Sequence, residues 1–389
     1  MDLLDSADLI LHQLIRDIIY FARIDATLAL SLTQRVLDHI TPTGPHQGQS
    51  VAFRLTRTED GRALLKENPI LLSFINHETL NHIIPAGPHQ DESVAFWLIS
   101  TRDGRALLTE NPTLLSSINK KTLNHIIATG PHQDESVALW LIANPDGRAL
   151  LKENPTLISF INENTLNHII PSGHYQGQSV AFRLICTPDG RALLKENPTL
   201  LGFINEKTFN HIFPIGHPQG RSVALWFIGN PDGRALLKEN PTLISFINEN
   251  TLNPIIPAGP HPGHSVAFWL IGTPDGRALL KENPTLISFI NEKTLNHIIP
   301  TGSHQGHSVA FWLKSTTDGQ VLLEKNPTLL DRINAGGGIP EGSRKRTSVE
   351  LLTGGVGFFG TTLIQTANQP LLSSEENDES PPLKIYRSE

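Results

Sequence analysis

One tetrapeptide, Ser-Val-Ala followed by Phe or Leu, recurs at a constant interval along this 389-residue chain, and it constrains the fold more than any other feature. Its seven copies are 43 residues apart, with no insertion or deletion between them, and begin at Ser50, Ser93, Ser136, Ser179, Ser222, Ser265 and Ser308. A fixed period of about 20 to 50 residues is typical of repeat proteins, in which each unit buries its apolar face against its neighbours. The sequence therefore predicts an array of stacked units.

Capping residues and apolar spacing within one repeat favour helices. From Ser265 the repeat reads SVAFWLIGTPDGRALLKENPTLISFINEKTLNHIIPTGSHQGH. Thr273-Pro274-Asp275 places a capping hydroxyl before a proline at the first helical position and an acid in the first turn. Apolar residues then recur three and four positions apart, as on one face of a helix. We predict an all-α, right-handed α-solenoid of seven repeats, each with short helices at Ser265–Ile271, Pro274–Glu282, Pro284–Ile290 and Glu292–Ile299 or their equivalents.

A seven-bladed β-propeller is the alternative, because such propellers also have units of about 43 residues. The string GHSVAF…TPDGRALL resembles parts of a WD repeat, but the Trp-Asp dipeptide is absent from the chain. Ankyrin repeats are the nearer helical comparison. SVAFWLI and GRALLKEN are distantly similar to their two helices, although the unit here is about ten residues longer.

The regularity of the repeats divides the chain into four segments. Residues 1–25 carry amphipathic apolar spacing and are expected to form an N-terminal capping helix. Residues 26–334 hold a partial repeat and seven full ones, with atypical ends that make the array soluble. Residues 335–366 are predicted to be a degenerate cap or linker. Residues 367–389 are polar and acidic, which favours a disordered tail.

Composition excludes several classes of function. The formal net charge is −7, with 31 basic and 38 acidic residues, which argues against nucleic acid as a partner. Cys186 is the only cysteine, so we expect no disulfides and a location in the cytoplasm of the producing cell. The first residues lack the order of a signal peptide, and no stretch reaches the roughly 18 apolar residues that span a bilayer.

One column of the repeat holds every tryptophan of the chain and two arginines. Its members are Arg54, Trp97, Trp140, Arg183, Trp226, Trp269 and Trp312. A position that accepts both Trp and Arg is expected to be half exposed, since burying an unpaired guanidinium is costly. Trp and Arg are also enriched at binding hot spots. We therefore predict that this Trp/Arg column binds a protein or peptide, with packing between repeats as the alternative interpretation.

A second column lies in the loop before each Ser-Val-Ala segment and changes from acidic to basic along the chain. We expect this loop column to face solvent; it comprises Gln49, Glu92, Glu135, Gln178, Arg221, His264 and His307. Two histidine columns also recur. They comprise His39, His82, His125, His168, His211 and His297, and, seven residues on, His46, His89, His132, His261 and His304. Zinc needs four converging ligands, so we expect loop-bracing hydrogen bonds here and no metal.

The same residues presented seven times make a poor active site. The Asp-Gly-Arg turn at Asp146 and its equivalents suits helix starts and charge ladders between repeats. Acid–base catalysis needs two carboxylates in different environments, which identical turns do not supply. We predict a non-enzymatic interaction scaffold without a cofactor. The alternatives are an enzyme whose activity lies outside the repeats and a purely structural spacer.

Near-identical units built on TPDGRALLKENP and ETLNxIIP resemble the repeat proteins of intracellular bacteria such as Legionella and Coxiella. The resemblance covers residues 26–334 and the last 17 residues. It implies that the protein is secreted by a type IV system into a host cell, where it binds a host protein. The residues that would carry the secretion signal are acidic and lie near the C-terminus: Glu375, Glu376, Asp378 and Glu379.

Overall fold

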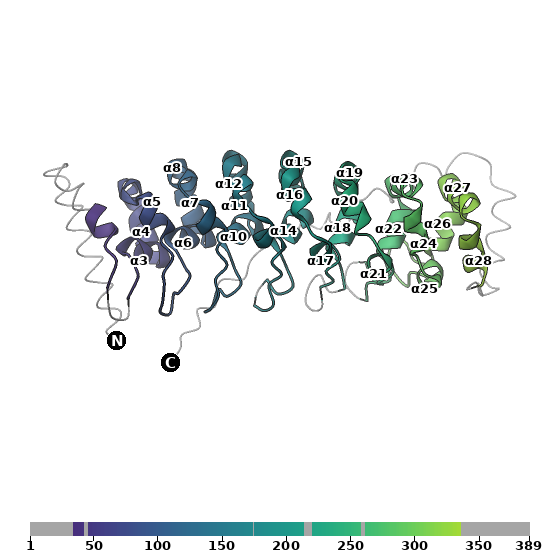
Figure 1. The fold of residues 1–389 in the computed structure, drawn as a ribbon, viewed down its shortest axis with the longest axis horizontal. Helices are drawn as coiled ribbons and strands as arrows, with labels where there is room; N and C mark the ends of the chain where they lie inside the picture. The colour runs from purple at the N-terminus through teal and green to yellow at the C-terminus, as the bar shows by residue number, and fades with distance from the viewer. Residues whose placement is uncertain (1–33, 43–45, 174, 214–219, 258–260, 336–389) are drawn as a thin grey trace. The chain divides into compact units, whose positions relative to one another are not determined.

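The computed structural model describes residues 34–42, 46–173, 175–213, 220–257 and 261–335 (Figure 1). The chain forms two compact units, Met1–Ile215 and Gly216–Glu389, which we call the first and second unit. The described residues are helical and form no strand, only isolated backbone bridges such as that between Ile126 and Ser136. The predicted all-α solenoid is confirmed within each unit, and the propeller alternative is not supported. The right-handed sense stays a prediction.

Each repeat of the first unit contains four helices in the same order (Figure 1). The first helices are α3 (Val51–Arg57), α6 (Val94–Ser100), α10 (Val137–Ala143) and α14 (Val180–Cys186). The second helices are α4 (Glu59–Glu67), α7 (Arg102–Glu110), α11 (Pro145–Glu153) and α15 (Pro188–Glu196). The third are η1 (Pro69–Phe74), α8 (Pro112–Ser116), α12 (Pro155–Phe160) and α16 (Pro198–Phe203). The fourth are α5 (His77–Asn81), α9 (Lys120–Asn124), α13 (Glu163–Asn167) and α17 (Glu206–Phe209).

The second unit repeats this order. Its first helices are α18 (Val223–Gly229), α22 (Val266–Gly272) and α26 (Val309–Ser315), and its second helices are α19 (Pro231–Glu239), α23 (Pro274–Glu282) and α27 (Thr317–Lys325). The third helices are α20 (Pro241–Ser245), α24 (Thr285–Ser288) and α28 (Pro327–Ala335), and the fourth are α21 (Glu249–Leu252) and α25 (Glu292–Asn296). α28 continues through the point at which the other third helices end, so the last repeat differs from the others in its third helix.

Caps fix where the helices begin. The hydroxyl of the repeated serine accepts a hydrogen bond from the backbone N–H three residues on, as Ser136 does from Leu139 at 3.1 Å. Asparagine caps the fourth helix in the same way, as Asn162 does for Thr165 at 2.8 Å. These caps satisfy backbone N–H groups that have no partner within the helix. The predicted start positions are therefore correct to within one residue.

The fourth helix is shorter than predicted. The helical interpretation of Ile298 and Ile299 is wrong, because the chain becomes extended at His297. Ile299 exchanges backbone hydrogen bonds with the loop that follows, donating to His307 at 2.9 Å and accepting from Gly306 at 3.0 Å. Neighbouring residues of this segment point to opposite sides, so that Ile298 is 52% exposed and Ile299 is 1% exposed.

The core of each unit lies between successive repeats. First helices pack in succession, as do second helices, and the leucine at the fifth position of α6, Leu98, is fully buried, as are its equivalents Leu55, Leu141 and Leu184. The predicted partial repeat belongs to this stack. Leu37 is 1% exposed, and Asp38 accepts a hydrogen bond from the side chain of Asn76 in the next repeat.

No helix within the described ranges is long and apolar enough to cross a membrane. Several predictions fall on residues outside those ranges. These are the capping helix at 1–25, the segment 336–366 of the predicted linker, the tail at 367–389 and the secretion-signal candidates Glu375, Glu376, Asp378 and Glu379.

Candidate partner-binding surfaces

The Trp/Arg column lies on the first helices, one residue before the buried leucine, whose place is taken by Phe227 after Trp226. Arg54, Trp97, Trp140, Arg183 and Trp312 are half-buried, as the mixture of Trp and Arg predicts. Trp226 and Trp269 are not: each is only 5% exposed. The expectation of a half-exposed column is wrong for these two, because side chains of the loop column cover them, and their remaining surface is too small to contact a partner.

In the first unit the loop column holds the tryptophans through carboxylates. Glu92 accepts a hydrogen bond from Trp97 Nε1 at 2.8 Å and another from His89 Nδ1 at 2.9 Å. Glu135 accepts from Trp140 and His132 at the same distances. Glu92 is 1% exposed and Glu135 is 8% exposed, so the prediction of a solvent-facing loop column is wrong. Two N–H donors compensate each buried carboxylate for the water that it loses.

The second unit fills the same positions with cations or neutral rings. The Arg221 guanidinium lies 5.6 Å from the centre of the Trp226 ring. His264 stacks on Trp269 with ring centres 5.3 Å apart, and its side chain is 2% exposed. Burial, together with the neighbouring His261 and His304, lowers the pKa of His264 to about 4. Trp269 Nε1 and Trp312 Nε1 are buried and have no hydrogen-bond partner among the described residues.

The two columns change together along the chain, which is a signal that each column by itself does not carry. Glutamine occurs only beside arginine (Gln49 with Arg54, Gln178 with Arg183), whereas Trp stands beside Glu, Arg or His. Comparing the loop column with the Trp/Arg column, repeat by repeat, would have indicated that their side chains are in direct contact. The Trp/Arg column is therefore occupied largely by contacts within the chain.

His82 and His168 of the first histidine column brace loops by hydrogen bonds, as predicted. Nε2 of His125 and of His297 is buried without a hydrogen-bond partner among the described residues. His82 Nε2 lies 3.1 Å from the carbonyl of Gly48, in the loop of the preceding repeat. His125 and His168 approach Asp91 and Asp134 at the equivalent loop position, at 3.4 and 3.2 Å. Within the described ranges no three His, Cys, Asp or Glu side chains are arranged to hold a metal ion.

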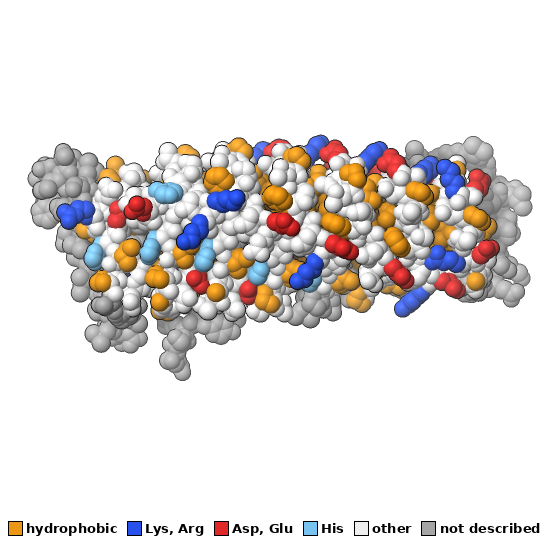
Figure 2. Space-filling model, in the orientation of Figure 1, with side chains coloured by type: hydrophobic (Ala, Val, Ile, Leu, Met, Phe, Trp, Pro, Cys, Tyr) orange, Lys and Arg blue, Asp and Glu red, His pale blue; other side chains and the backbone are white. Residues whose placement is uncertain are grey.

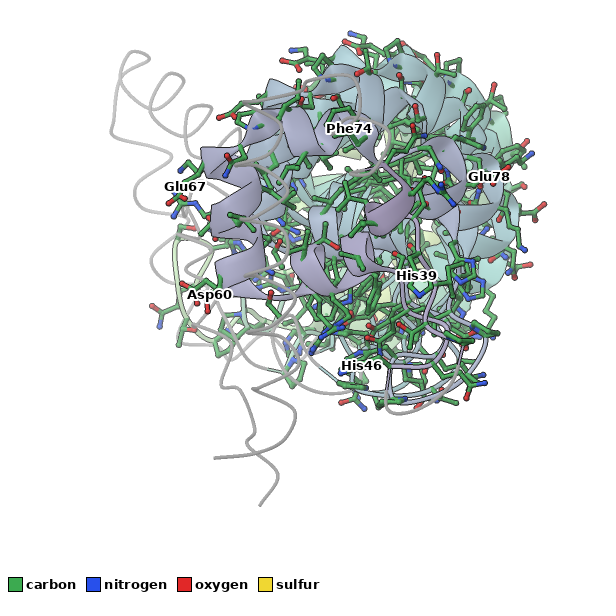
Figure 3. The ribbon with its side chains drawn as sticks, turned by 90° about the vertical axis from the view of Figure 1, so that its left-hand side faces the viewer. His39, His46, Asp60, Glu67, Phe74 and Glu78 are labelled. Atoms are coloured by element: carbon green, nitrogen blue, oxygen red, sulfur yellow. The ribbon has the colours of Figure 1, made fainter. Side chains whose placement is uncertain are left out.

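A further surface, which we call the ridge, is formed around the fourth helices and was not predicted from the sequence. The ridge of a repeat consists of its fourth helix, the residue equivalent to Phe74 at the end of the third helix, and the first isoleucine of the extended segment. The residue at the Phe74 position is aromatic in each of the first six full repeats except that of Ser93, which carries Ser117. Figure 3 shows Phe74 and Glu78 of the ridge on a different side of the repeat from Asp60 and Glu67 of the second helix. The ridge isoleucines are Ile40, Ile83, Ile126, Ile169, Ile212, Ile255 and Ile298.

Every ridge isoleucine is at least partly exposed, with values of 41% for Ile40, 38% for Ile212 and 52% for Ile298. The aromatic position is also partly exposed, reaching 38% at Phe289. Figure 2 shows apolar side chains that recur among charged ones along the face in view. The sequence signal was available, since each of the first six full repeats carries two adjacent β-branched or aromatic residues here and an extended segment can bury only one of them.

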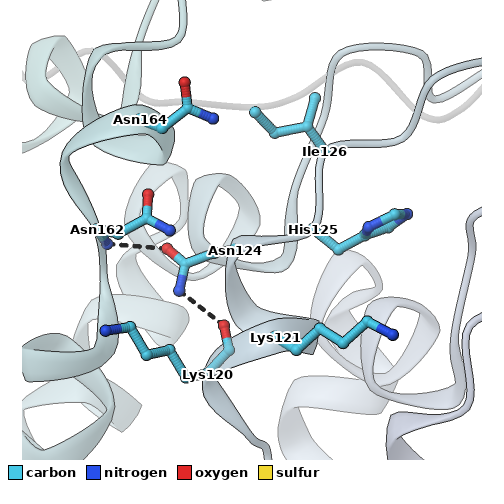
Figure 4. A pocket seen from close by; sticks show the side chains of 7 residues that line it. All are labelled: Lys120, Lys121, Asn124, His125, Ile126, Asn162 and Asn164. Carbon is cyan, nitrogen blue, oxygen red and sulfur yellow. Dashed lines mark hydrogen bonds between the residues drawn. The ribbon is translucent and has the colours of Figure 1, made fainter.

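A groove of about 600 Å³ opens between α9 and the start of α13 (Figure 4). The Asn124 side chain holds the two repeats together at its centre. Its Oδ1 accepts from the backbone N–H of Asn162 at 2.9 Å, and its Nδ2 donates to the carbonyls of Lys120 and Phe160 at 2.7 and 2.8 Å. The lining residues are Lys120, Lys121, Asn124, His125, Ile126, Asn162 and Asn164.

Comparison of the chain with models of protein families, with curated proteins and with solved structures found no match in any of the three.

Proposed function

We propose that the chain is a non-enzymatic scaffold that binds a protein or peptide along the ridge. The observation that carries this proposal is the partly or fully exposed isoleucine that follows the fourth helix of the first six full repeats, each next to a buried apolar residue. An apolar side chain that stays accessible at the same position of successive repeats presents one anchor per repeat to a partner. By contrast, Trp97, Trp140, Trp226 and Trp269 of the Trp/Arg column contact side chains of the loop column within the chain.

The charges beside the ridge isoleucines support a role in recognition. The first two positions of the fourth helix are exposed and differ between repeats: His77-Glu78, Lys120-Lys121, Glu163-Asn164, Glu206-Lys207, Glu249-Asn250 and Glu292-Lys293. An apolar centre with a polar rim is the usual anatomy of an interface. In this arrangement the isoleucines supply affinity and the variable rim supplies selectivity between partners.

Ridge-dependent binding is tested by selecting short peptides from a random displayed library against the full chain. We expect selected peptides to bind with micromolar affinity. This affinity should fall at least tenfold when Ile126 and Ile169 are both changed to Gln. Circular dichroism should show unchanged helix content, because both side chains are only half-buried.

Ile70 offers a matched control. It is 60% exposed but belongs to no repeated column, since the other repeats carry Thr at its position. The Ile70→Thr variant should bind the selected peptides as the wild type does. Equal affinity of the wild type and the Ile126→Gln, Ile169→Gln variant would exclude the ridge as the binding surface.

A further inference from the structure

The ridge of the repeat that begins at Ser93 differs in charge from the others. Lys120 and Lys121 give this fourth helix a pair with net charge +2, whereas the equivalent pairs of the other full repeats carry −1 or 0 and Gln34-Arg35 of the partial repeat carries +1. Both lysines are exposed. In a chain whose units are otherwise almost identical, this reversal marks one position on the array.

The reversed charge does not stabilise the helix itself. Glutamate at the first position is favoured by the partial positive charge of a helix N-terminus, as at Glu163, and lysine is disfavoured there. Nor do the lysines pair within the described part of the chain, where neither ammonium lies within ion-pair distance of a carboxylate. Lys238 and Lys281, by contrast, pair with Glu282 and Asp318.

The two lysines border the groove of about 600 Å³, and none of its seven lining residues is acidic. Ile126 supplies a half-buried apolar side chain, and the Asn162 and Asn164 amides supply hydrogen-bond donors on the opposite side (Figure 4). His125, which also lines the groove, contacts Asp91 at 3.4 Å. The exposed Glu163 lies in the sequence between Asn162 and Asn164 and is not part of the lining. The groove is shallow and open to solvent, so that a bound segment would lie along it with one side exposed.

We propose that this groove binds an acidic peptide segment, with carboxylates placed against Lys120 and Lys121 and an apolar side chain on Ile126. The inference rests on the proposed function, since it assigns a partner chemistry to one part of the ridge. Charge complementarity raises the association rate and selects against basic segments. Exposed lysines give modest affinity that falls as salt screens the charges.

The probe is a fluorescein-labelled pentapeptide of sequence Glu-Glu-Leu-Glu-Glu, titrated with the full chain and followed by fluorescence anisotropy. We expect saturable binding that weakens at least threefold between 50 and 300 mM NaCl. A peptide with lysine in place of each glutamate should not bind. If the acidic peptide does not bind, the proposal is overturned.

Changing Lys120 to Glu and Lys121 to Asn installs the pair found at Glu163-Asn164, so the variant should fold. We expect it to lose at least tenfold in affinity for the acidic peptide. A control carries the same charge change on exposed lysines of the second helices, Lys152→Glu and Lys195→Asn, away from the ridge. An equal loss in both variants would mean that net charge alone is responsible and would overturn the site.

The acidic-peptide titration and the library selection test the two proposals separately. Library-selected peptides that depend on Ile126 and Ile169 would still support the scaffold if the acidic peptide failed to bind. Failure of both experiments would reject the scaffold and the acidic site together.

Discussion

At the level of single residues, the Asp-Gly-Arg turn explains how the second helix packs on the first. A Cβ atom at Gly147 would lie 2.2 Å from the carbonyl oxygen of Leu141, so the two backbones touch. The next residue, Arg148, is buried and donates from Nη1 to the carbonyl of Ile142 at 2.8 Å. This hydrogen bond satisfies a carbonyl at the end of α10 that has no helical partner.

The glycine contact predicts a large effect of one methyl group. Changing Gly147 to Ala should destabilise the first unit by about 2 kcal/mol or more, because backbone must move to admit the Cβ atom. The measurement is urea unfolding followed by circular dichroism. Gly202→Ala is the matched control, since a Cβ atom added there would meet no atom within 4 Å and most repeats carry Ser at this position. If the two variants unfolded at the same urea concentration, close packing at the turn would not be limiting.

The ion pairs at this turn could be predicted from the sequence, whereas the burial of two tryptophans could not. The charge ladder that it predicted is present, with Arg148 Nε 3.9 Å from Asp189 and Arg277 Nε 3.8 Å from Asp318. The burial of Trp226 and Trp269 could not be inferred from their column alone. Burial there depends on which side chain of the loop column lies against each ring, and that partner differs between repeats.

At the level of helices, one asparagine joins the fourth helix to that of the next repeat in four of the repeats. Asn167 Oδ1 accepts from the backbone N–H of Asn205 at 3.1 Å, and its Nδ2 donates to the carbonyl of Phe203 at 2.7 Å. Its own carbonyl accepts from the Thr208 hydroxyl at 3.3 Å. Asn81, Asn124 and Asn253 make the same contacts. One amide therefore fixes the spacing between neighbouring repeats.

Removing this amide should loosen one junction. We expect Asn167→Ala to cost about 1–3 kcal/mol, because it leaves a backbone N–H and a carbonyl without partners. Hydrogen exchange of the full chain should show faster exchange at 203–208. Thr199→Ala, an exposed substitution in α16, should leave that segment unchanged. Unchanged protection in the Asn167→Ala variant would show that packing alone sets the spacing.

The helices themselves were largely predictable, because caps and proline positions are local signals. The asparagine junction was not, since its partners are 36 to 41 residues away and nothing in a helical period shows which polar groups meet. The extended segment after the fourth helix was missed for a related reason. Its hydrogen bonds come from a loop about eight residues on, and these outweigh the helical spacing of the isoleucines.

At the scale of the whole molecule, the two units differ in the loop-column side chains that lie beside the Trp/Arg column. The first unit has glutamine or glutamate there, and the second has arginine or histidine. In the first unit, burial lowers the pKa of His132, but the hydrogen bond and charge of Glu135, with Glu92, outweigh it and raise the pKa overall. The folded state therefore binds this proton more tightly than the unfolded state. The resulting stabilisation is full below the unfolded pKa of about 6.5 and is lost as the pH rises through the raised value.

His264 behaves in the opposite way. Its folded pKa of about 4 lies below the unfolded value, so the unfolded state binds the proton more readily between these two pH values. The stabilisation is complete above pH 6.5 and decreases by up to about 3 kcal/mol as the pH falls to 4. The groups that face His264 are His261 and His304, and the pKa of His304 is also lowered, by burial and then by His307 and His261.

Mild acid should therefore destabilise the second unit more than the first. Hydrogen exchange of the full chain at pH 7.5 and pH 5, corrected for intrinsic rates, should show loss of protection in α22 and α26 while α6 and α10 keep theirs. Changing His264 to Glu should suppress this loss, because the carboxylate can accept from Trp269 as Glu135 does from Trp140. His77→Gln, an exposed change in the first unit, should alter neither unit. Equal acid sensitivity of the two units, or of the His264→Glu variant and the wild type, would show that the loop column does not govern the response to pH.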